Sequence, residues 1–141
     1  MSKKTIIEKF NDEKHVKVEI IEKDFADMKT GEKMFIASPK IIDNYINHIP
    51  KGKSVSLKTL RKDLAIEYHA DNTCPLTAGI FLRIVAEKNY EDFSNGKSIE
   101  KITPFWRVIE PTSPMLKKLS FGKEFVLEQH QKENLFIQKL N

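Results

Sequence analysis

The chain has 141 residues, of which 40% are hydrophobic and 31% charged, enough for one globular domain but too few for two independent ones. Its 24 basic and 20 acidic residues give a net charge of +4, which is compatible with a polyanionic partner. One Cys and four scattered His exclude an internal disulfide and a cysteine-rich zinc site, so we expect no structural metal and no cofactor. The short apolar runs predict a cytoplasmic protein without a membrane partner.

Residues 1–37 are expected to form an N-terminal extension, and residues 38–141 the main domain. The extension is rich in Lys and Glu, and its apolar and polar residues alternate at 15–20, which predicts a short strand. Residues 24–33 carry few apolar side chains and predict a loop. A short apolar stretch follows at 34–36.

Two helices are predicted next, each opened by a serine. Ser38 precedes Pro39 in the pattern of an N-cap followed by proline at the first helical position. The apolar residues after it recur at helical spacing up to Pro50: Ile41, Ile42, Tyr45, Ile46 and Ile49. Residues 50–53 predict a turn, and Ser56 is expected to cap a second helix through Leu57, Leu60, Leu64 and Ile66.

A third helix is predicted from Pro75, after a polar capping segment at 71–73 and Cys74. Its apolar face contains Leu76, Ile80, Phe81, Ile84 and Val85. The polar residues 88–101 predict an exposed loop, with a turn at 94–97. Residues 102–109 predict a buried strand, residues 111–114 a turn that fits a wing, and residues from 125 a closing helix followed by a terminal strand at 135–137.

This order of elements resembles the DNA-binding domain of the methylated-DNA–protein cysteine methyltransferase and alkyltransferase-like family. Two motifs carry the resemblance, Ile49-Pro50-Lys51-Gly52-Lys53 and Pro104-x-x-Arg107-Val108. The similarity covers about residues 38–132. Residues 33–107 also look like a cysteine-less bacterial branch of that family. The resemblance implies a mainly α fold with short strands (α+β), a winged helix-turn-helix of the alkyltransferase DNA-binding type.

The segment that the family uses for chemistry is altered in this chain. Catalytic members have Cys-His-Arg where this chain has Phe105-Trp106-Arg107, so both the nucleophile and its base are absent there. The resemblance therefore implies no alkyl transfer at this segment and no enzyme. Alkyltransferase-like proteins, which carry Trp in place of the Cys, bind alkylated guanine without repair, so Phe105, Trp106 and Arg107 are candidates for a base pocket. The alternative is that both aromatic residues are core residues on opposite faces of a strand, with Arg107 in a structural role.

The expected DNA-contacting residues surround the helix-turn-helix. Cations near it could neutralise phosphates in a salt-dependent, sequence-independent way: Lys51, Lys53, Lys58, Arg61 and Lys62. Thr73 and the free N–H groups of the next helix would add a phosphate site. The family's duplex-entering Arg falls at Leu76 and its Tyr at Leu57, which weakens base flipping, although Leu76 could act as an apolar wedge beside Arg83. The alternative for the cations is a solvated lysine-rich face.

Three hypotheses for function follow. The first is a non-enzymatic DNA-binding protein of alkyltransferase-like type that recognises alkylated or modified bases without repairing them. The second is a degenerate winged-helix scaffold that binds another protein. The third is an alkyl acceptor that uses Cys74, whose pKa a helix start could lower, although a buried small apolar side chain is the simpler explanation of this residue.

Overall fold

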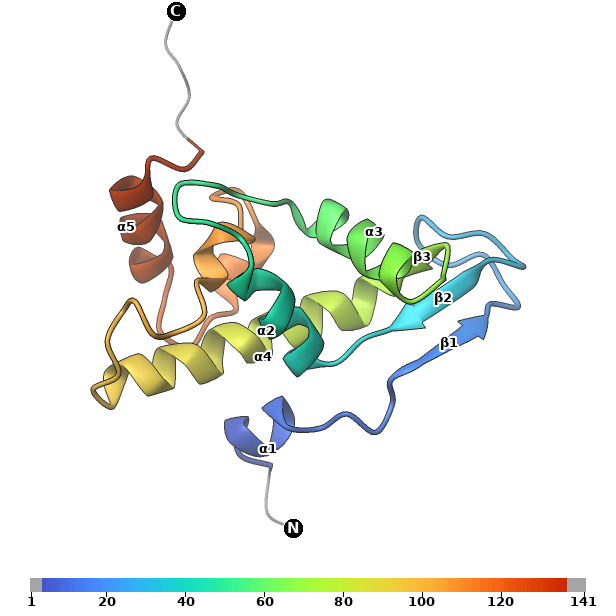
Figure 1. Cartoon of the computed structure of the whole chain (residues 1–141), viewed down its shortest axis with the longest axis horizontal. Helices are drawn as coiled ribbons and strands as arrows, with labels where there is room; N and C mark the ends of the chain where they lie inside the picture. The colour runs from blue at the N-terminus through green and yellow to red at the C-terminus, as the bar shows by residue number, and fades with distance from the viewer. Residues whose placement is uncertain (1–3, 137–141) are drawn as a thin grey trace, which may run out of the picture.

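A long central helix organises the chain, with a small sheet at one end and the last helix near the other (Figure 1). The computed structural model describes residues 4–136, which form a mixed α+β fold. Its elements in chain order are α1 (Ile6–Phe10), β1 (Lys17–Ile20), β2 (Lys33–Ile36), α2 (Pro39–Asn47), α3 (Leu57–Glu67), β3 (Asn72–Thr73), α4 (Pro75–Ser94), η1 (Phe105–Arg107), η2 (Pro114–Lys117) and α5 (Glu124–Glu133).

Helices α2 and α3 begin where their serines predict. The Ser38 hydroxyl accepts a hydrogen bond from Ile41 N at 3.2 Å, and the Ser56 hydroxyl accepts one from Thr59 N at 3.0 Å. Each bond satisfies one of the N–H groups that the first turn of a helix leaves free. The turn between the helices is confirmed as well, with Gly52 at φ +82°, a conformation that glycine adopts without steric cost.

Helix α4 starts at Pro75 as predicted but is much longer than the sequence pattern indicated. The expected exposed loop is wrong for residues 88–94, which continue the helix to Ser94. Asn89 is only 2% exposed. Its side-chain amide donates a hydrogen bond to Asp43 and accepts one from the backbone N–H of Thr103. The expected polar cap at 71–73 is also wrong, because Cys74 is the N-cap and makes no capping bond through its side chain. The predicted turn at 94–97 is confirmed.

The predicted strand at 15–20 forms over Lys17–Ile20 and pairs antiparallel with β2, which in turn pairs in parallel with β3. The parallel register places Met34 opposite Asn72 and Phe35 opposite Thr73. Phe35 is 1% exposed and packs in the main core. Residues 4–37, expected as an extension, therefore share one core with the chain that follows residue 38.

Residues 102–109 are buried as predicted, but they contain no strand. Phe105–Arg107 form the 3₁₀ helix η1, which has three residues per turn, so adjacent side chains are not sent to opposite faces. Where a wing was expected, residues 111–113 form a turn that leads into η2. Helix α5 ends at Glu133, and its C-cap residue Asn134 has the left-handed φ of +57°. Leu135 and Phe136 then lie in a turn, and the remainder of the predicted terminal strand, Ile137, lies outside the described residues.

Candidate nucleic-acid interface

Phe105, the first candidate for the base pocket, is completely buried. Its ring centroid lies 5.4 Å from that of Trp106 and 5.9 Å from those of Phe121 and Phe125. These edge-on and offset contacts are those that aromatic side chains favour in protein cores. The ring therefore offers no free face on which a base could stack, and the expectation that Phe105 lines a base pocket is replaced by a role in the core.

Trp106 and Arg107 converge on one carboxylate that the sequence did not reveal, that of Glu133 in α5. The Trp106 Nε1 donates to Oε2 at 2.7 Å. The Arg107 guanidinium donates to both carboxylate oxygens, at 2.9 and 3.0 Å, and its third nitrogen donates to the carbonyl of Ile49 at 2.7 Å. The Gly52 N–H completes the set at 2.9 Å from Oε1. These contacts favour the structural role considered for Arg107, because all three guanidinium nitrogens have partners.

The Glu133 carboxylate is ionised in this setting. Burial alone would raise its pKa, but hydrogen bonds from Arg107, Gly52 and Trp106 outweigh burial and leave the pKa below its ordinary value. A carboxylate that already accepts four hydrogen bonds has little remaining capacity to act as a general base. No local sequence pattern could identify it, since Glu133 lies 81 residues from Gly52 and 26 from Arg107.

Four of the predicted cations remain available at the surface. Lys51 and Lys53 lie in the turn after α2, Lys58 in the first turn of α3, and Lys62 one turn further along, and all four are exposed. The Lys62 amine donates to the carbonyl of Asp71 at 3.3 Å, a weak contact that a phosphate could replace. The contacts to Glu133 hold this turn in place, so Lys51 and Lys53 extend from an ordered backbone.

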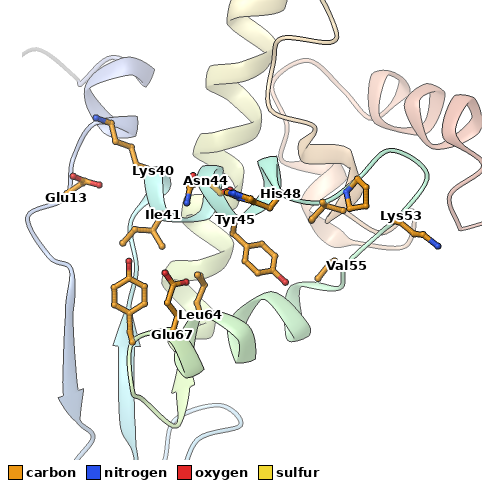
Figure 2. Close-up of a pocket in the computed structure, with 13 residues that line it drawn as sticks. Glu13, Lys40, Ile41, Asn44, Tyr45, His48, Lys53, Val55, Leu64 and Glu67 are labelled. Carbon is orange, nitrogen blue, oxygen red and sulfur yellow. The ribbon is translucent and has the colours of Figure 1, made fainter.

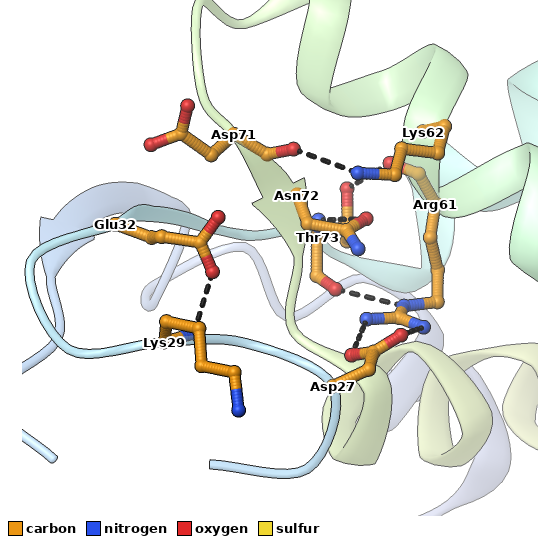
Figure 3. A network of polar contacts seen from close by, with 8 residues as sticks. All are labelled: Asp27, Lys29, Glu32, Arg61, Lys62, Asp71, Asn72 and Thr73. Carbon is orange, nitrogen blue, oxygen red and sulfur yellow. Dashed lines mark hydrogen bonds and ion pairs between the residues drawn. The ribbon is translucent and has the colours of Figure 1, made fainter. Parts of the chain in front are cut away.

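Arg61 is not available, and the expectation that it contacts phosphate is wrong for this structure (Figure 3). Arg61 is 6% exposed, and its guanidinium forms a bidentate ion pair with Asp27, at 2.7 and 2.8 Å, while Nε donates to the carbonyl of Thr73 at 2.9 Å. Asp27 comes from the loop between β1 and β2, and hydrogen bonding to Arg61 lowers the Asp27 pKa. Arg61 thus fastens this loop and β3 to α3.

Thr73 is likewise withdrawn from the surface. Its side chain is fully buried, and its hydroxyl donates to the carbonyl of Arg61 at 2.7 Å. The phosphate site expected from Thr73 is therefore wrong. Cys74, next in the chain, is 4% exposed and packs with Ile21, Met28 and Met34, which fits a small apolar side chain better than an alkyl acceptor.

Leu76 and Arg83 both lie exposed on α4, in agreement with an accessible helix surface. Leu76 is 61% exposed in the first turn, and Ile80, one turn further, is 49% exposed. Large apolar side chains that project this far are candidates for insertion into a partner.

A hollow of about 290 Å³ lies directly beside the start of α3. It is formed by three parts of the chain: residues 56–58 at the start of α3, Leu82 of α4, and the segments 108–110 and 112–115 that follow η1. Its volume is close to the lower end of the range of small-ligand pockets. Leu57, Val108 and Met115 make part of the wall apolar, while Lys58 adds a positive charge and Glu110 a negative one.

A larger groove, of about 720 Å³, runs between α2 and α3 (Figure 2). Ile41, Val55 and Leu64 contribute apolar surface, and the Tyr45 hydroxyl donates to Asp63 at 2.5 Å. Burial, followed by the neighbouring Asp63 carboxylate, raises the Tyr45 pKa. Charges of both signs line this groove, including Glu13, Lys40, Lys53 and Glu67, so it presents no uniformly positive surface to a nucleic acid.

Within residues 4–136, no three His, Cys, Asp or Glu side chains come together as a possible metal site, and no helix has the length and apolar character needed to cross a membrane. Comparison with protein-family models, with curated proteins and with solved structures returned no match.

Proposed function

We propose that this chain is a non-enzymatic DNA-binding protein of alkyltransferase-like type. In this proposal α3 and α4 form the helix-turn-helix, and the segment from residue 111 to η2 takes the place of the wing. The observation that carries the proposal is the hollow beside α3, which adjoins Lys58 and the N-terminal N–H groups of that helix. Phosphates bound there would bring an unpaired base within reach of the hollow.

The absence of alkyl transfer at η1 is part of the proposal. Phe105 and Trp106 carry no nucleophile, and the carboxylate nearest to them is engaged by Arg107 and Gly52. A base that enters the hollow would meet Leu57, Val108 and Met115, side chains that can contact it but cannot accept an alkyl group as a thiolate does. The protein would bind a modified base and leave it unchanged.

Binding to short duplexes with and without an alkylated guanine, measured across a salt series, tests this proposal. Each phosphate contact adds about 0.9 to the slope of log K against log salt, so replacing Lys51, Lys53 and Lys58 together by Ala should lower that slope by about 2.7. Lys97→Ala is the matched control, because Lys97 is exposed in the turn that follows the other end of α4. No binding to either duplex at low salt would exclude the proposal.

The role of the hollow has its own test. Met115→Trp should fill the hollow and remove any preference for the alkylated duplex, while binding to the unmodified duplex stays unchanged. Met115→Leu is the control, since it nearly preserves the volume of the side chain. A preference that survives Met115→Trp would place base recognition elsewhere.

A second candidate function is a scaffold that binds another protein, and exposed Leu76 and Ile80 favour it. They lie one turn apart on α4, where apolar side chains at this spacing can enter a partner's groove. Replacing both by Ser separates the two functions. Loss of DNA binding in that variant would identify Leu76 and Ile80 as DNA contacts, whereas unchanged DNA binding would leave them available for a protein.

A further inference from the structure

A separate hollow of about 490 Å³ lies between the C-terminal half of α4, η1 and α5. It shares no lining residue with the hollow beside α3. Its apolar surface comes from Phe93, Ile99 and Phe125, all partly exposed, and from the buried Trp106. Partly exposed aromatic rings around a hollow offer contact surface to a planar ligand.

The side chain of Gln129 is a polar group of this hollow that forms no hydrogen bond with the described residues. Gln129 is 6% exposed. The fully enclosed side-chain atoms that lack a partner among the described residues are Thr77 Oγ1 and His130 Nδ1, so the Gln129 amide is not an unsatisfied buried group. Arg107 and Glu133, which also line the hollow, are paired with each other. Gln129 therefore offers a polar contact to a ligand in the hollow.

The chemistry of this amide points to a class of ligand. A glutamine side chain presents a donor and an acceptor side by side, which matches the paired acceptor and donor on the edge of a nucleobase, as in bidentate contacts to adenine. Charges of both signs line this hollow, with Glu100 and Glu128 beside the basic residues, so a phosphate would depend on Lys51. Lys51 is exposed and makes no ion pair among the described residues, while Lys132 is paired with Glu128 at 3.2 Å.

We propose that this hollow binds a nucleotide, with its base against the exposed surface of the aromatic side chains, the base edge on Gln129 and the phosphate at Lys51. The site goes beyond the DNA-binding function proposed above, because it requires neither a duplex nor the surface of α3. The nucleotide could be free or could be one unit of a single strand, and both sources present the same base and phosphate.

Trp106 makes the test direct, because it is the only tryptophan in the chain and it lines this hollow. Tryptophan fluorescence of the full chain is titrated with AMP, GMP, CMP and dTMP, and separately with oligo-dA and oligo-dT single strands. We expect a saturable change with at least one of these probes. Saturation by a mononucleotide identifies a free nucleotide, and saturation by a single strand alone identifies a strand as the source.

Variants decide whether the signal arises from the proposed contacts. Gln129→Leu should weaken binding at least tenfold, and Gln131→Leu, an exposed position on the same helix, should leave it unchanged. If Gln129→Leu does not fold, Lys51→Glu serves as the second variant, since Lys51 is at the surface, and should weaken binding by a similar factor. No saturable change with any probe, or binding that resists these substitutions, would overturn the proposal. Lys51 takes part in both proposals, so Gln129→Leu, which leaves the three lysines in place, separates them: it should weaken nucleotide binding and leave the salt dependence of duplex binding unchanged.

Discussion

Removing the Glu133 carboxylate is expected to be among the most damaging single changes in this protein. Glu133 has a side chain that is 5% exposed and accepts four hydrogen bonds, two of them from Arg107, which is itself only 13% exposed. Glu133→Ala leaves that guanidinium charged, buried and bonded only to the carbonyl of Ile49. Breaking a buried ion pair in this way costs about 3–5 kcal/mol, against a total stability of about 5–15 kcal/mol for a domain.

Urea unfolding followed by circular dichroism measures this loss. With a slope of about 2 kcal/mol per molar urea, the midpoint of Glu133→Ala should fall by about 2 M. Glu128→Ala is the matched control on the same helix. It removes a pair whose partners are about 60% exposed, so we expect a change below about 0.5 kcal/mol.

A double variant separates the ion pair from the other contacts. Arg107→Met combined with Glu133→Leu removes both charges, and replacing a buried pair by apolar side chains is often close to neutral. The Trp106 indole and the Gly52 N–H would still lack an acceptor, so we expect recovery of about half of the loss. If Glu133→Ala lowers the free energy of unfolding by less than about 1 kcal/mol, the hydrogen bonds to Glu133 do not stabilise the fold as a buried ion pair does.

Three further predictions concern the buried groups. Burial lowers the pKa of His130, which is 4% exposed, so the unfolded chain takes up a proton at a higher pH than the folded chain does. The free energy of unfolding should therefore fall as the pH decreases through the ordinary value of 6.5. His130→Phe should reduce this pH dependence, measured by urea unfolding at pH 5 and 7.5. Arg61→Met should lower the thermal midpoint without altering the salt dependence of DNA binding, whereas a reduced salt slope would show that Arg61 reaches phosphate. Phe105→Cys should give a thiol that reacts with an aromatic disulfide reagent only after unfolding, and rapid reaction in the native state would contradict the burial of η1.

The local features of the fold were accessible from the sequence. Ser38, Ser56 and Pro75 mark the helix starts because capping and proline geometry depend on a few neighbouring residues. The sequence did not predict the C-terminal part of α4, because the many polar residues after Lys88 indicated a loop. Tyr90 and Phe93 nevertheless continue the helical spacing of apolar residues there. A short apolar run such as 102–109 contains no period long enough to separate a strand from a 3₁₀ turn.

The partners of charged residues were not accessible, since they depend on contacts between distant segments. Arg61 belongs to a basic cluster in the sequence, yet it pairs with Asp27, which lies 34 residues earlier in the expected loop. Nothing near either residue marks the pairing. The exposed lysines of the turn and of α3 were predicted correctly as surface groups, because lysine rarely occupies a core without a partner.

The position of Glu133 has a consequence for how the protein is made. Its bonds to Gly52 and Arg107 join the turn at residues 50–53 to the last helix of the described chain, over a separation of 81 residues. During synthesis the chain emerges from its N-terminus, so the turn leaves the ribosome well before the carboxylate that anchors it. Contacts of such long range also form late in folding. The turn that carries Lys51 and Lys53 should therefore acquire its final shape only when α5 docks, which delays any ligand binding at this turn until α5 has been synthesised.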